Sequence, residues 1–453
     1  MRRSLILFLK VAAVVTIAVW LANRPGQVEF VWQGQVFETS IGVLVLLVGL
    51  LMAGAAFGYR FWRGMVRAPG TIGRARLGSR REGGYRALTN GMVAVAAGDP
   101  TAARRYAKKA DALLDEPPLT MLLSAQAAQL SGDETAAGRY FEAMLEREET
   151  EFLGLRGLLN QALKQDDRVK ALSFVDLARK LRPNTPWVLA TAFELEVRQR
   201  KWREAQASLA AAVKAGAIEA GEGRRHKAAI LIERSREAEA AGDMPTALEL
   251  AHKATSLLPG FAPAINREAA LLARADRLKQ AARLIEKAWE QAPHLTLAQA
   301  YLDLAPREGG ALERVKWIEK LHRLKPEAAE VLAVLGEAAL AAQLWGAART
   351  HLTRAEQVSP SRRIYRLLAE LEAKEHEDMV AARNWLAKAE EAPDDPAWLC
   401  DRCGTAHPVW TALCRHCGAF DVLTWRTPTA AAHLPAPDAR ALAVIDRSSE
   451  GPR

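Results

Sequence analysis

The feature that most constrains this chain is a motif that returns every 34 residues. Most copies have a Gly or Asp marker, a short break, an alanine and a second alanine seven positions later. Markers at 98, 132, 166 and 200 are spaced by 34, as are those at 242 and 276. The copies are Gly98-Asp99 with Ala103 and Ala110, Gly132-Asp133 with Ala137 and Phe141, Asp166-Asp167 with Ala171 and Ala178, Arg200-Lys201 with Ala205 and Ala212, Gly242-Asp243 with Ala247 and Ala254, and Asp276 with Ala281 and Ala288.

This period, with small residues at fixed places, is typical of tetratricopeptide repeats, which are helix–turn–helix units that stack into a superhelix. Alanine lets paired helices approach closely, and a Gly or Asp marker ends the first helix. We therefore predict an all-α array of about nine repeats over residues 84–396. A generic alanine-rich bundle is the alternative, but it would not reproduce the constant offset. Weaker copies follow, one ending at Pro326, one with Gly336, Ala348, Ala355 and Pro360, and one with Ala382 and Ala389.

Two further expectations follow from the repeats. The offset of 42 between the markers at 200 and 242 implies eight extra residues, which we assign to a loop over Lys214–Arg225. The first helices of the repeats would line a concave groove, whose polar residues are either a solvated helix face or a binding surface for an acidic partner segment. The groove candidates are Arg156, Asn160, Lys164, Arg198, Arg236, Asn266 and Arg274.

The net charge of +9 lies at the N-terminus and does not indicate nucleic-acid binding. Residues 1–23 carry +3, residues 24–39 carry −1, residues 60–86 carry +7, and the rest of the chain is neutral overall. The basic segments flank two apolar stretches, which is a membrane pattern. Ser4–Ala22 is apolar except for Lys10, and Ser40–Tyr59 has twenty residues without a charge. Twenty helical residues span about 30 Å, the thickness of the hydrocarbon core.

We therefore predict a transmembrane hairpin over residues 1–62, followed by a basic juxtamembrane linker over 63–83. Both ends of the chain would face the cytoplasm, because positive charge stays inside. The short periplasmic loop would hold a small β-hairpin, Val28–Trp32 with Gln35–Thr39. A cleaved signal peptide is the alternative for the first helix, but no convincing cleavage site follows it. Lys10 either extends to the interface or meets a partner helix or an anionic lipid.

The four cysteines of the chain lie together near the C-terminus as two C-x-x-C-G motifs. Cys400, Cys403, Cys414 and Cys417 are expected to bind one metal ion tetrahedrally within a small rubredoxin-like or zinc-ribbon domain, residues 397–426. Zinc and iron both fit these ligands. Two disulfides are the alternative, disfavoured in a reducing cytoplasm. Four cysteines leave no position for water, so the site is structural rather than catalytic.

Further expectations concern the surroundings of this metal site. Trp398, Trp410, Phe420 and Trp425 would pack around the metal-binding domain, and His407 and His416 would be exposed bystanders. Loss of the metal would unfold this domain and leave the repeats helical. The Pro- and Ala-rich tail, residues 427–453, is predicted to be disordered.

Common catalytic and cofactor motifs are absent from the sequence. We find no G-x-G-x-x-G, Walker loop, H-E-x-x-H or G-x-S-x-G. Neither C-x-x-C is followed by His, so a covalent c-type haem site is absent. The scattered histidines are expected at surface or packing positions, and we predict that the chain is not an enzyme. These histidines are His226, His252, His294, His322 and His351.

These parts together resemble the proteobacterial HemY family. The resemblance covers the two apolar helices with Lys10, the loop from Pro25 to Ser40, of which Glu38-Thr39-Ser40 is the most specific part, and the repeats. The C-terminal cysteines resemble the alphaproteobacterial form. The resemblance implies an inner-membrane protein that organises or regulates late haem (protoporphyrin) biosynthesis enzymes, without oxidase activity.

A second resemblance is to LapB, an adaptor for a membrane protease in lipopolysaccharide assembly. LapB also joins a membrane anchor, these repeats and a four-cysteine domain, but it has one membrane helix. An enzyme or a direct haem carrier is a third hypothesis that no motif supports. The partner, the oligomeric state and the choice between zinc and iron stay open at this point.

Overall fold

The computed structural model describes residues 26–428 except 33, 115 and 307, together with scattered residues between 8 and 23; the side chains of 27, 30–32, 35–38, 64–77 and 117 are not described. Lys10, most of the predicted first membrane helix and the predicted disordered tail beyond residue 428 lie outside the described residues. The chain divides into two units, Met1–Tyr140 and Phe141–Arg453, and each is described by itself.

The first unit begins with the β-hairpin that the sequence predicts. Strands β1 (Gln27–Trp32) and β2 (Gln35–Ser40) pair antiparallel, with Trp32 opposite Gln35 across the turn. Gly34 in this turn has φ 84°, a left-handed conformation that glycine adopts without steric cost. Helix α2 starts at the residue after β2.

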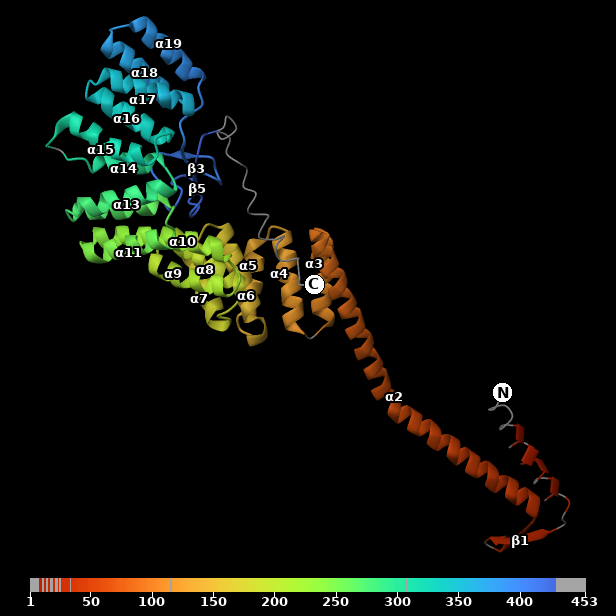
Figure 1. Cartoon of the computed structure of the whole chain (residues 1–453). Coiled ribbons are helices and arrows are strands. Elements are labelled where there is room, and N and C mark those ends of the chain that lie inside the picture. The colour runs from red at the N-terminus through yellow and green to blue at the C-terminus, as the bar shows by residue number, and fades with distance from the viewer. Residues whose placement is uncertain are drawn as a thin grey trace. The chain divides into compact units, whose positions relative to one another are not determined.

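Helix α2 (Ile41–Ala96) runs without interruption for 56 residues (Figure 1). Its segment Ile41–Arg63 has a mean hydropathy of 2.5 and is the one stretch among the described residues that is long and apolar enough to cross a membrane. The second predicted span is thus an exposed apolar helix. The predicted linker, residues 63–83, is helical and continues α2. The last turns of α2 bury Ala87 and Ala94 in the core they form with α3 and α4, so α2 is also the first helix of the first repeat.

The repeats follow as helix pairs, nine of them among the described residues counting the end of α2 with α3. In the first unit the helices are α2, α3 (Pro100–Leu113), α4 (Pro117–Leu130) and the start of α5 (Glu134–Met144), which crosses the boundary. The second unit continues with α6 (Glu148–Lys164), α7 (Arg168–Leu181), α8 (Pro186–Arg198), α9 (Trp202–Lys214), α10 (Ala220–Ala240), α11 (Met244–Leu257), α12 (Ala262–Arg274), α13 (Leu278–Gln291), α14 (Leu295–Asp303), α15 (Gly310–Leu324), α16 (Ala329–Ala341), α17 (Trp345–Val358), α18 (Arg362–Glu375) and α19 (Met379–Glu391).

The sequence markers are the turns between the two helices of a pair. Gly98 and Asp166, for example, have φ of 72° and 53°, the left-handed conformation that ends a helix. Asp99 and Asp243 then cap the next helix, because their carboxylates accept hydrogen bonds from its first free N–H groups. The alanines of the motif are buried where helices meet, as in Ala171 at 0 % exposure.

The eight extra residues are located differently from the prediction. Only residues 215–219 form a loop, and the rest lengthens α10 at its N-terminus to 21 residues. The expectation of a loop over Lys214–Arg225 is therefore wrong for most of its length. Two of the six residues at 220–225 are glycines, which disfavour helix, so the helical form of the added turns depends on tertiary contacts, described below.

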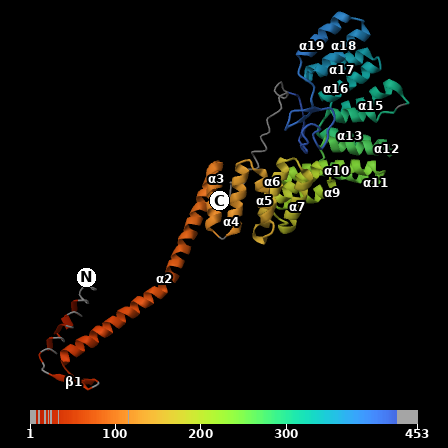
Figure 2. The ribbon, with the colours of Figure 1, turned by 180° about the vertical axis from the view of Figure 1, so that it is seen from behind.

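The chain ends its described part in a small three-stranded antiparallel sheet. Strands β3 (Ala397–Cys400), β4 (Ala406–His407) and β5 (Leu423–Arg426) have the order β4-β3-β5. We call residues 397–426 the four-cysteine module. Its buried residues join one hydrophobic cluster with residues of α8–α12, whereas α6–α8 and α12–α18 have clusters of their own. Figure 2 shows the strands from the other side.

Candidate metal centre

The four cysteine sulfurs converge on one point. All four Sγ atoms lie within 4.8 Å of one another. Cys400 Sγ is 3.7 Å from Cys417 Sγ, and Cys403 Sγ is 3.7 Å from Cys414 Sγ. A disulfide needs about 2.05 Å, and all four cysteines are free. Sulfurs bound tetrahedrally at about 2.3 Å from a metal lie roughly 3.8 Å apart, so these residues fit a metal ion held by four thiolates.

The two turns that carry the cysteines have the same backbone. Gly404 and Gly418, each directly after a C-x-x-C, have φ of 72° and 66°. Their N–H groups donate to the carbonyls of Cys400 and Cys414 at 2.8 and 2.9 Å, closing each turn. Burial raises the pKa of the Cys400 thiol above its ordinary value, and a metal ion at the site would favour the thiolate.

His407 contradicts the prediction that it is an exposed bystander. It is 5 % exposed, and its Nε2 lies 3.3 Å from Cys414 Sγ. An imidazole N–H there can donate to a metal-bound thiolate, which is a supporting contact around the ligands. The strand pairing of His407 with Trp398 brings its ring to the sulfur. His416 is exposed, as expected.

The module is fixed to the repeats by one buried aspartate. The Asp421 side chain is fully buried and has a left-handed backbone, φ 51°. Its Oδ2 lies 2.9 Å from His226 Nδ1, and its Oδ1 lies 3.3 Å from Arg225 Nε. Arg225 also donates to the carbonyls of Asp421 and Leu423. A buried carboxylate is costly unless it is paired, so this contact fixes the module on α10.

Aromatic side chains extend this contact to both sides of α10. Phe420 lies 5.6 Å from Phe193 of α8 and 6.2 Å from Trp202 of α9, measured between ring centroids. Trp410 meets Phe261, at the start of α12, at 5.3 Å. Both Phe420 and Trp410 were predicted to pack around the module itself. They also form one hydrophobic core with the repeats.

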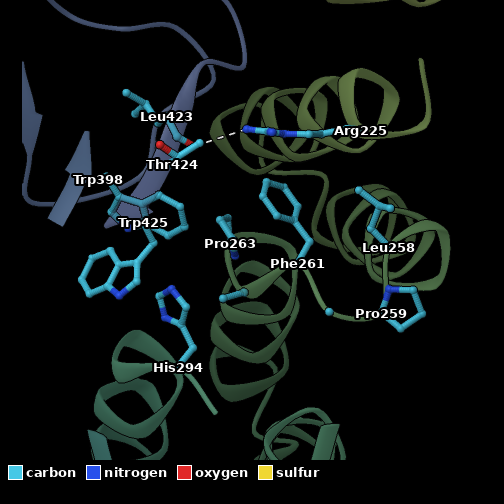
Figure 3. Close-up of a pocket in the computed structure, with 12 residues that line it drawn as sticks. Arg225, Leu258, Pro259, Phe261, Pro263, His294, Trp398, Leu423, Thr424 and Trp425 are labelled. Atoms are coloured by element: carbon cyan, nitrogen blue, oxygen red, sulfur yellow. Dashed lines mark hydrogen bonds between the residues drawn. The ribbon is translucent and has the colours of Figure 1, made fainter. Parts of the chain in front are cut away.

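A largely apolar pocket of about 450 Å³ lies where the module meets α10, α12 and α14 (Figure 3). His294 caps α14 and packs against Trp398 and Trp425, at 5.5 and 4.8 Å between ring centroids. Desolvation lowers the pKa of His294 to about 4, so the ring is neutral near pH 7. Phe261 and Pro263 form the opposite side of the pocket.

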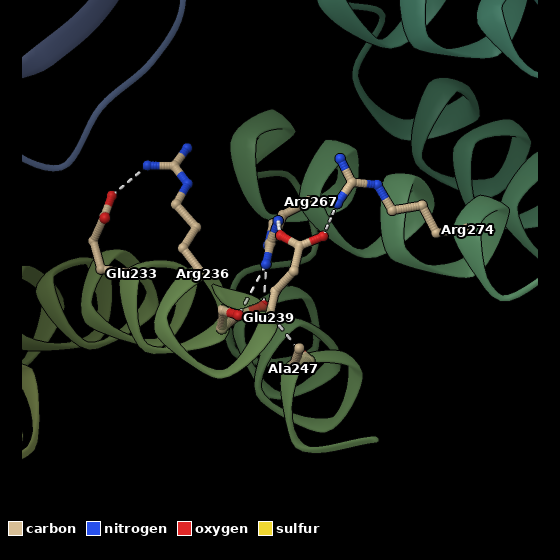
Figure 4. A network of polar contacts seen from close by, with 7 residues as sticks. Glu233, Arg236, Glu239, Ala247, Arg267 and Arg274 are labelled. Carbon is tan, nitrogen blue, oxygen red and sulfur yellow. Dashed lines mark hydrogen bonds and ion pairs between the residues drawn. The ribbon is translucent and has the colours of Figure 1, made fainter. Parts of the chain in front are cut away.

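The seven groove candidates lie on first helices of their repeats, α6, α8, α10 and α12. Most of the arginines among them have acidic partners within the chain. Arg198 pairs with Glu194, and Arg236 pairs with Glu233. Arg274 pairs with Glu239, which Arg267 also contacts (Figure 4).

The remaining candidates also make contacts. Arg156 lies over the ring of Trp187 at 5.3 Å, and Asn266 donates to Thr296. Asn160 is half-buried and Lys164 exposed at the C-terminal end of α6. The prediction of a groove that binds a partner therefore stays a prediction, and three of its arginines are engaged by acidic residues of the array itself.

Sequence reasoning missed the residues that join the metal site to the repeats. Asp421 is nearly 200 positions from Arg225 and His226 in the chain, and no local pattern connects them. One signal was available, since Arg225 and His226 lie at the end of the eight-residue insertion. The insertion therefore supplies the two residues of the repeats that bind Asp421 of the module.

The N-terminal part of the chain matches a known family. The family model described as HemY protein N-terminus matches residues 26–132. The resemblance to HemY predicted from sequence is thereby confirmed. The matched segment includes the candidate membrane helix and the first repeat.

One relative extends over nearly the whole chain. The probable magnetosome protein Mms48 of Magnetospirillum gryphiswaldense is 27% identical over 442 residues, 93% of each chain. Among solved structures, a tetratricopeptide repeat protein from Parabacteroides merdae is 16% identical, with a TM-score of 0.27 over 56% of this chain and 93% of that one. A crystal structure of MamA is 15% identical, with a TM-score of 0.26 over 39% and 92%.

Proposed function

We propose that this protein is an inner-membrane scaffold that organises or regulates late haem biosynthesis enzymes by binding them with its repeats. The observation that carries the proposal is helix α2, in which the apolar segment Ile41–Arg63 continues directly into the first repeat. The match to the HemY N-terminus covers both the apolar segment and the first repeat. A partner bound to the repeats would be held at the membrane surface.

The proposed topology has two membrane passes with both ends of the chain in the cytoplasm. Arg60 and Arg63, at the end of the apolar segment of α2, favour that orientation. The four-cysteine module would then be in a reducing compartment, where zinc or iron is bound by thiolates. Four protein ligands leave no open position, so we assign the metal a structural role and no catalytic one.

The binding surface in this proposal is the face formed by the first helices of the repeats. Because Arg198 and Arg236 have acidic partners already, an acidic segment would have to compete with Glu194 and Glu233 for them. Arg156 is stacked on Trp187 rather than paired with a carboxylate, and offers its charge more directly. A partner would therefore be recognised by shape and apolar contact as well as by charge.

A LapB-like adaptor for a membrane protease is the second candidate. The observation that favours it is the docking of the four-cysteine module on α8–α12, which places a metal domain directly on the repeat surface. In that case the module, rather than the groove, would be central to partner binding. Because one relative is described as a probable magnetosome protein, magnetosome proteins are a third class of partner to test.

The test is affinity purification of the tagged full-length protein in mild detergent, with mass spectrometry of the proteins that accompany it. One variant reverses Arg156, Arg198 and Arg236 to Glu. A matched control reverses Lys180, Arg203 and Arg283, which are exposed on second helices. We expect a late haem enzyme, such as ferrochelatase, with the wild type and the control but not with the groove variant.

Other outcomes would replace the proposal. A membrane protease and its substrates would favour the adaptor, and magnetosome proteins would favour a role like that suggested by the relative's name. A haem-dependent absorption band of the purified full-length protein, beyond any signal of the cysteine-bound metal, would favour a haem carrier.

A further inference from the structure

The hydrophobic core of the second unit is divided near α10. Buried residues of α6–α8 form one cluster, and buried residues of α12–α18 form another. Between them lies a third cluster, made of residues from α8–α12 together with residues of the four-cysteine module. Much of the packing between the repeats before and after α10 therefore runs through a core that the module shares, beside a smaller cluster of Ala247, Ala251 and Leu271 between α11 and α12.

The four-cysteine module contacts the repeats on both sides of this division. On one side it contacts Phe193 of α8 and Trp202 of α9 through Phe420. On the other side, Trp410 contacts Phe261 and Trp425 contacts His294. Between these, Asp421 is held by Arg225 and His226 in the added turns of α10. The insertion that breaks the repeat period thus builds the docking point for the module.

These contacts require a folded module. Its three strands have four, two and four residues, too few to form a stable core of their own, so a metal ion at the four cysteines would supply much of the folding free energy. Asp421 has a left-handed backbone and a carbonyl that reaches Arg225 only in this folded turn. Phe420 follows Cys417 by three residues, and its backbone bridges to Leu413, next to Cys414. Metal ligation and docking are therefore parts of one structure.

We propose that the metal-loaded four-cysteine module is an intramolecular brace that fixes the arrangement of the repeats on the two sides of α10. Loss of the metal releases the brace and exposes Phe193, Trp202 and Phe261. The state of the metal site thereby controls the shape of the surface that the repeats offer to partners. The brace acts in the same way whichever partner the repeats bind.

The experiment is hydrogen exchange with mass spectrometry on the full-length protein in detergent, before and after the metal is removed with a strong chelator. We expect amides of α8, of the N-terminal turns of α10 and of the start of α12 to exchange at least about tenfold faster without metal. Amides of α16 and α17, whose buried residues belong to a cluster without module residues, are the internal reference and should not change.

Two variants separate docking from metal binding. Asp421→Asn removes the charge but keeps a residue that tolerates a left-handed backbone. Arg225→Met acts from the repeat side, on a residue in α10 rather than in the module. Asp401→Asn is the matched control, because Asp401 is also in the module but pairs with Arg426 there. Metal content is measured for each by elemental analysis.

We expect Arg225→Met to hold one metal ion per chain and yet to exchange as fast as the wild-type protein without metal. We expect Asp401→Asn to exchange as slowly as the metal-loaded wild type. Asp421→Asn should match Arg225→Met. Unchanged exchange at α8, α10 and α12 after chelation would overturn the proposal. So would wild-type protection in Arg225→Met, since that variant keeps the module's own ligands and fold.

Discussion

The repeats α12–α19 and the contact of the four-cysteine module with α8–α12, which we call the junction, differ in how far apart in sequence their contacting residues lie, although both belong to the same unit. In the repeats, contacts join residues within about one period, and the packing repeats with it. At the junction, Asp421 meets Arg225 and His226 across 195 or more positions of sequence. The structure of the first region is determined by a local sequence pattern. The structure of the second depends on the four-cysteine module, which follows the last repeat in the sequence but contacts repeats in the middle of the array.

The largest expected effect is loss of the metal ligands. Cys400→Ser with Cys403→Ser removes two thiolates, and metal binding in such small domains contributes on the order of 10 kcal/mol to their folding. We expect the module to unfold, with a large change in the fluorescence of Trp398 and Trp410, while most of the helical circular dichroism signal remains. Complete melting of the helical signal would show that the module and the repeats are one cooperative unit.

A smaller effect tests the close approach of helices in the regular repeats. Ala103 in α3 is 0 % exposed, and Leu in its place would have to displace its neighbours. We expect Ala103→Leu to lower the free energy of unfolding of the repeats by about 1–3 kcal/mol. The measurement is the midpoint of thermal unfolding by circular dichroism. Ala112→Leu, exposed on the same helix, is the control and should leave the midpoint nearly unchanged. Equal effects of both would contradict the assigned packing.

The repeat turns offer a reciprocal pair of substitutions. Gln343 occupies a turn with φ 57°, where a Cβ is disfavoured, and Gly242 occupies the equivalent turn with φ 80°. We expect Gln343→Gly to raise the free energy of unfolding by about 1 kcal/mol and Gly242→Gln to lower it by about the same amount. Chemical denaturation of the two variants side by side checks this, and effects of the same sign would argue against equivalent turns.

The smallest predicted effect is a pH dependence at the junction. The pKa of His294 is lowered to about 4 in the fold, against about 6.5 when unfolded. The unfolded chain therefore binds the extra proton first, and stability falls as pH decreases below about 6.5. Between about pH 7.5 and about pH 6 the loss from this residue is about 0.8 kcal/mol. In His294→Phe the stability curve should be flatter over this range, whereas a parallel curve would contradict a neutral His294 in the fold.

The sequence predicts the regular region well because its causes are local. The markers at 98, 132, 166, 200, 242 and 276 are all left-handed turns in the structure. Gln343 and Glu377 have the same conformation but lack the Gly or Asp that marks most of the other turns, so the pattern missed them. Gly336, taken as part of a weak copy, lies inside α16, where an added Cβ would come within 2.6 Å of the Leu352 side chain.

The candidate site divides in the same way. Spacing alone predicts the four cysteines, since two C-x-x-C-G turns specify a ligand set locally. The burial of His407 and the docking of Asp421 depend on which surfaces meet in three dimensions. The apolar aromatics near the cysteines do not indicate whether they cover the module or bind the repeats. The insertion before α10 was visible as a broken period, but its helical form and its contacts were not.

The most direct test of the junction is a double-mutant cycle between Asp421 and Arg225. The variants are Asp421→Asn, Arg225→Met and their combination, and the measured quantity is the free energy of opening at α10, from hydrogen exchange of the metal-loaded full-length protein. We predict a coupling energy of about 1–2 kcal/mol, as expected for a partly buried charge pair in contact. Strictly additive effects would mean that the two residues do not interact, and that the four-cysteine module is not held on the repeats in this way.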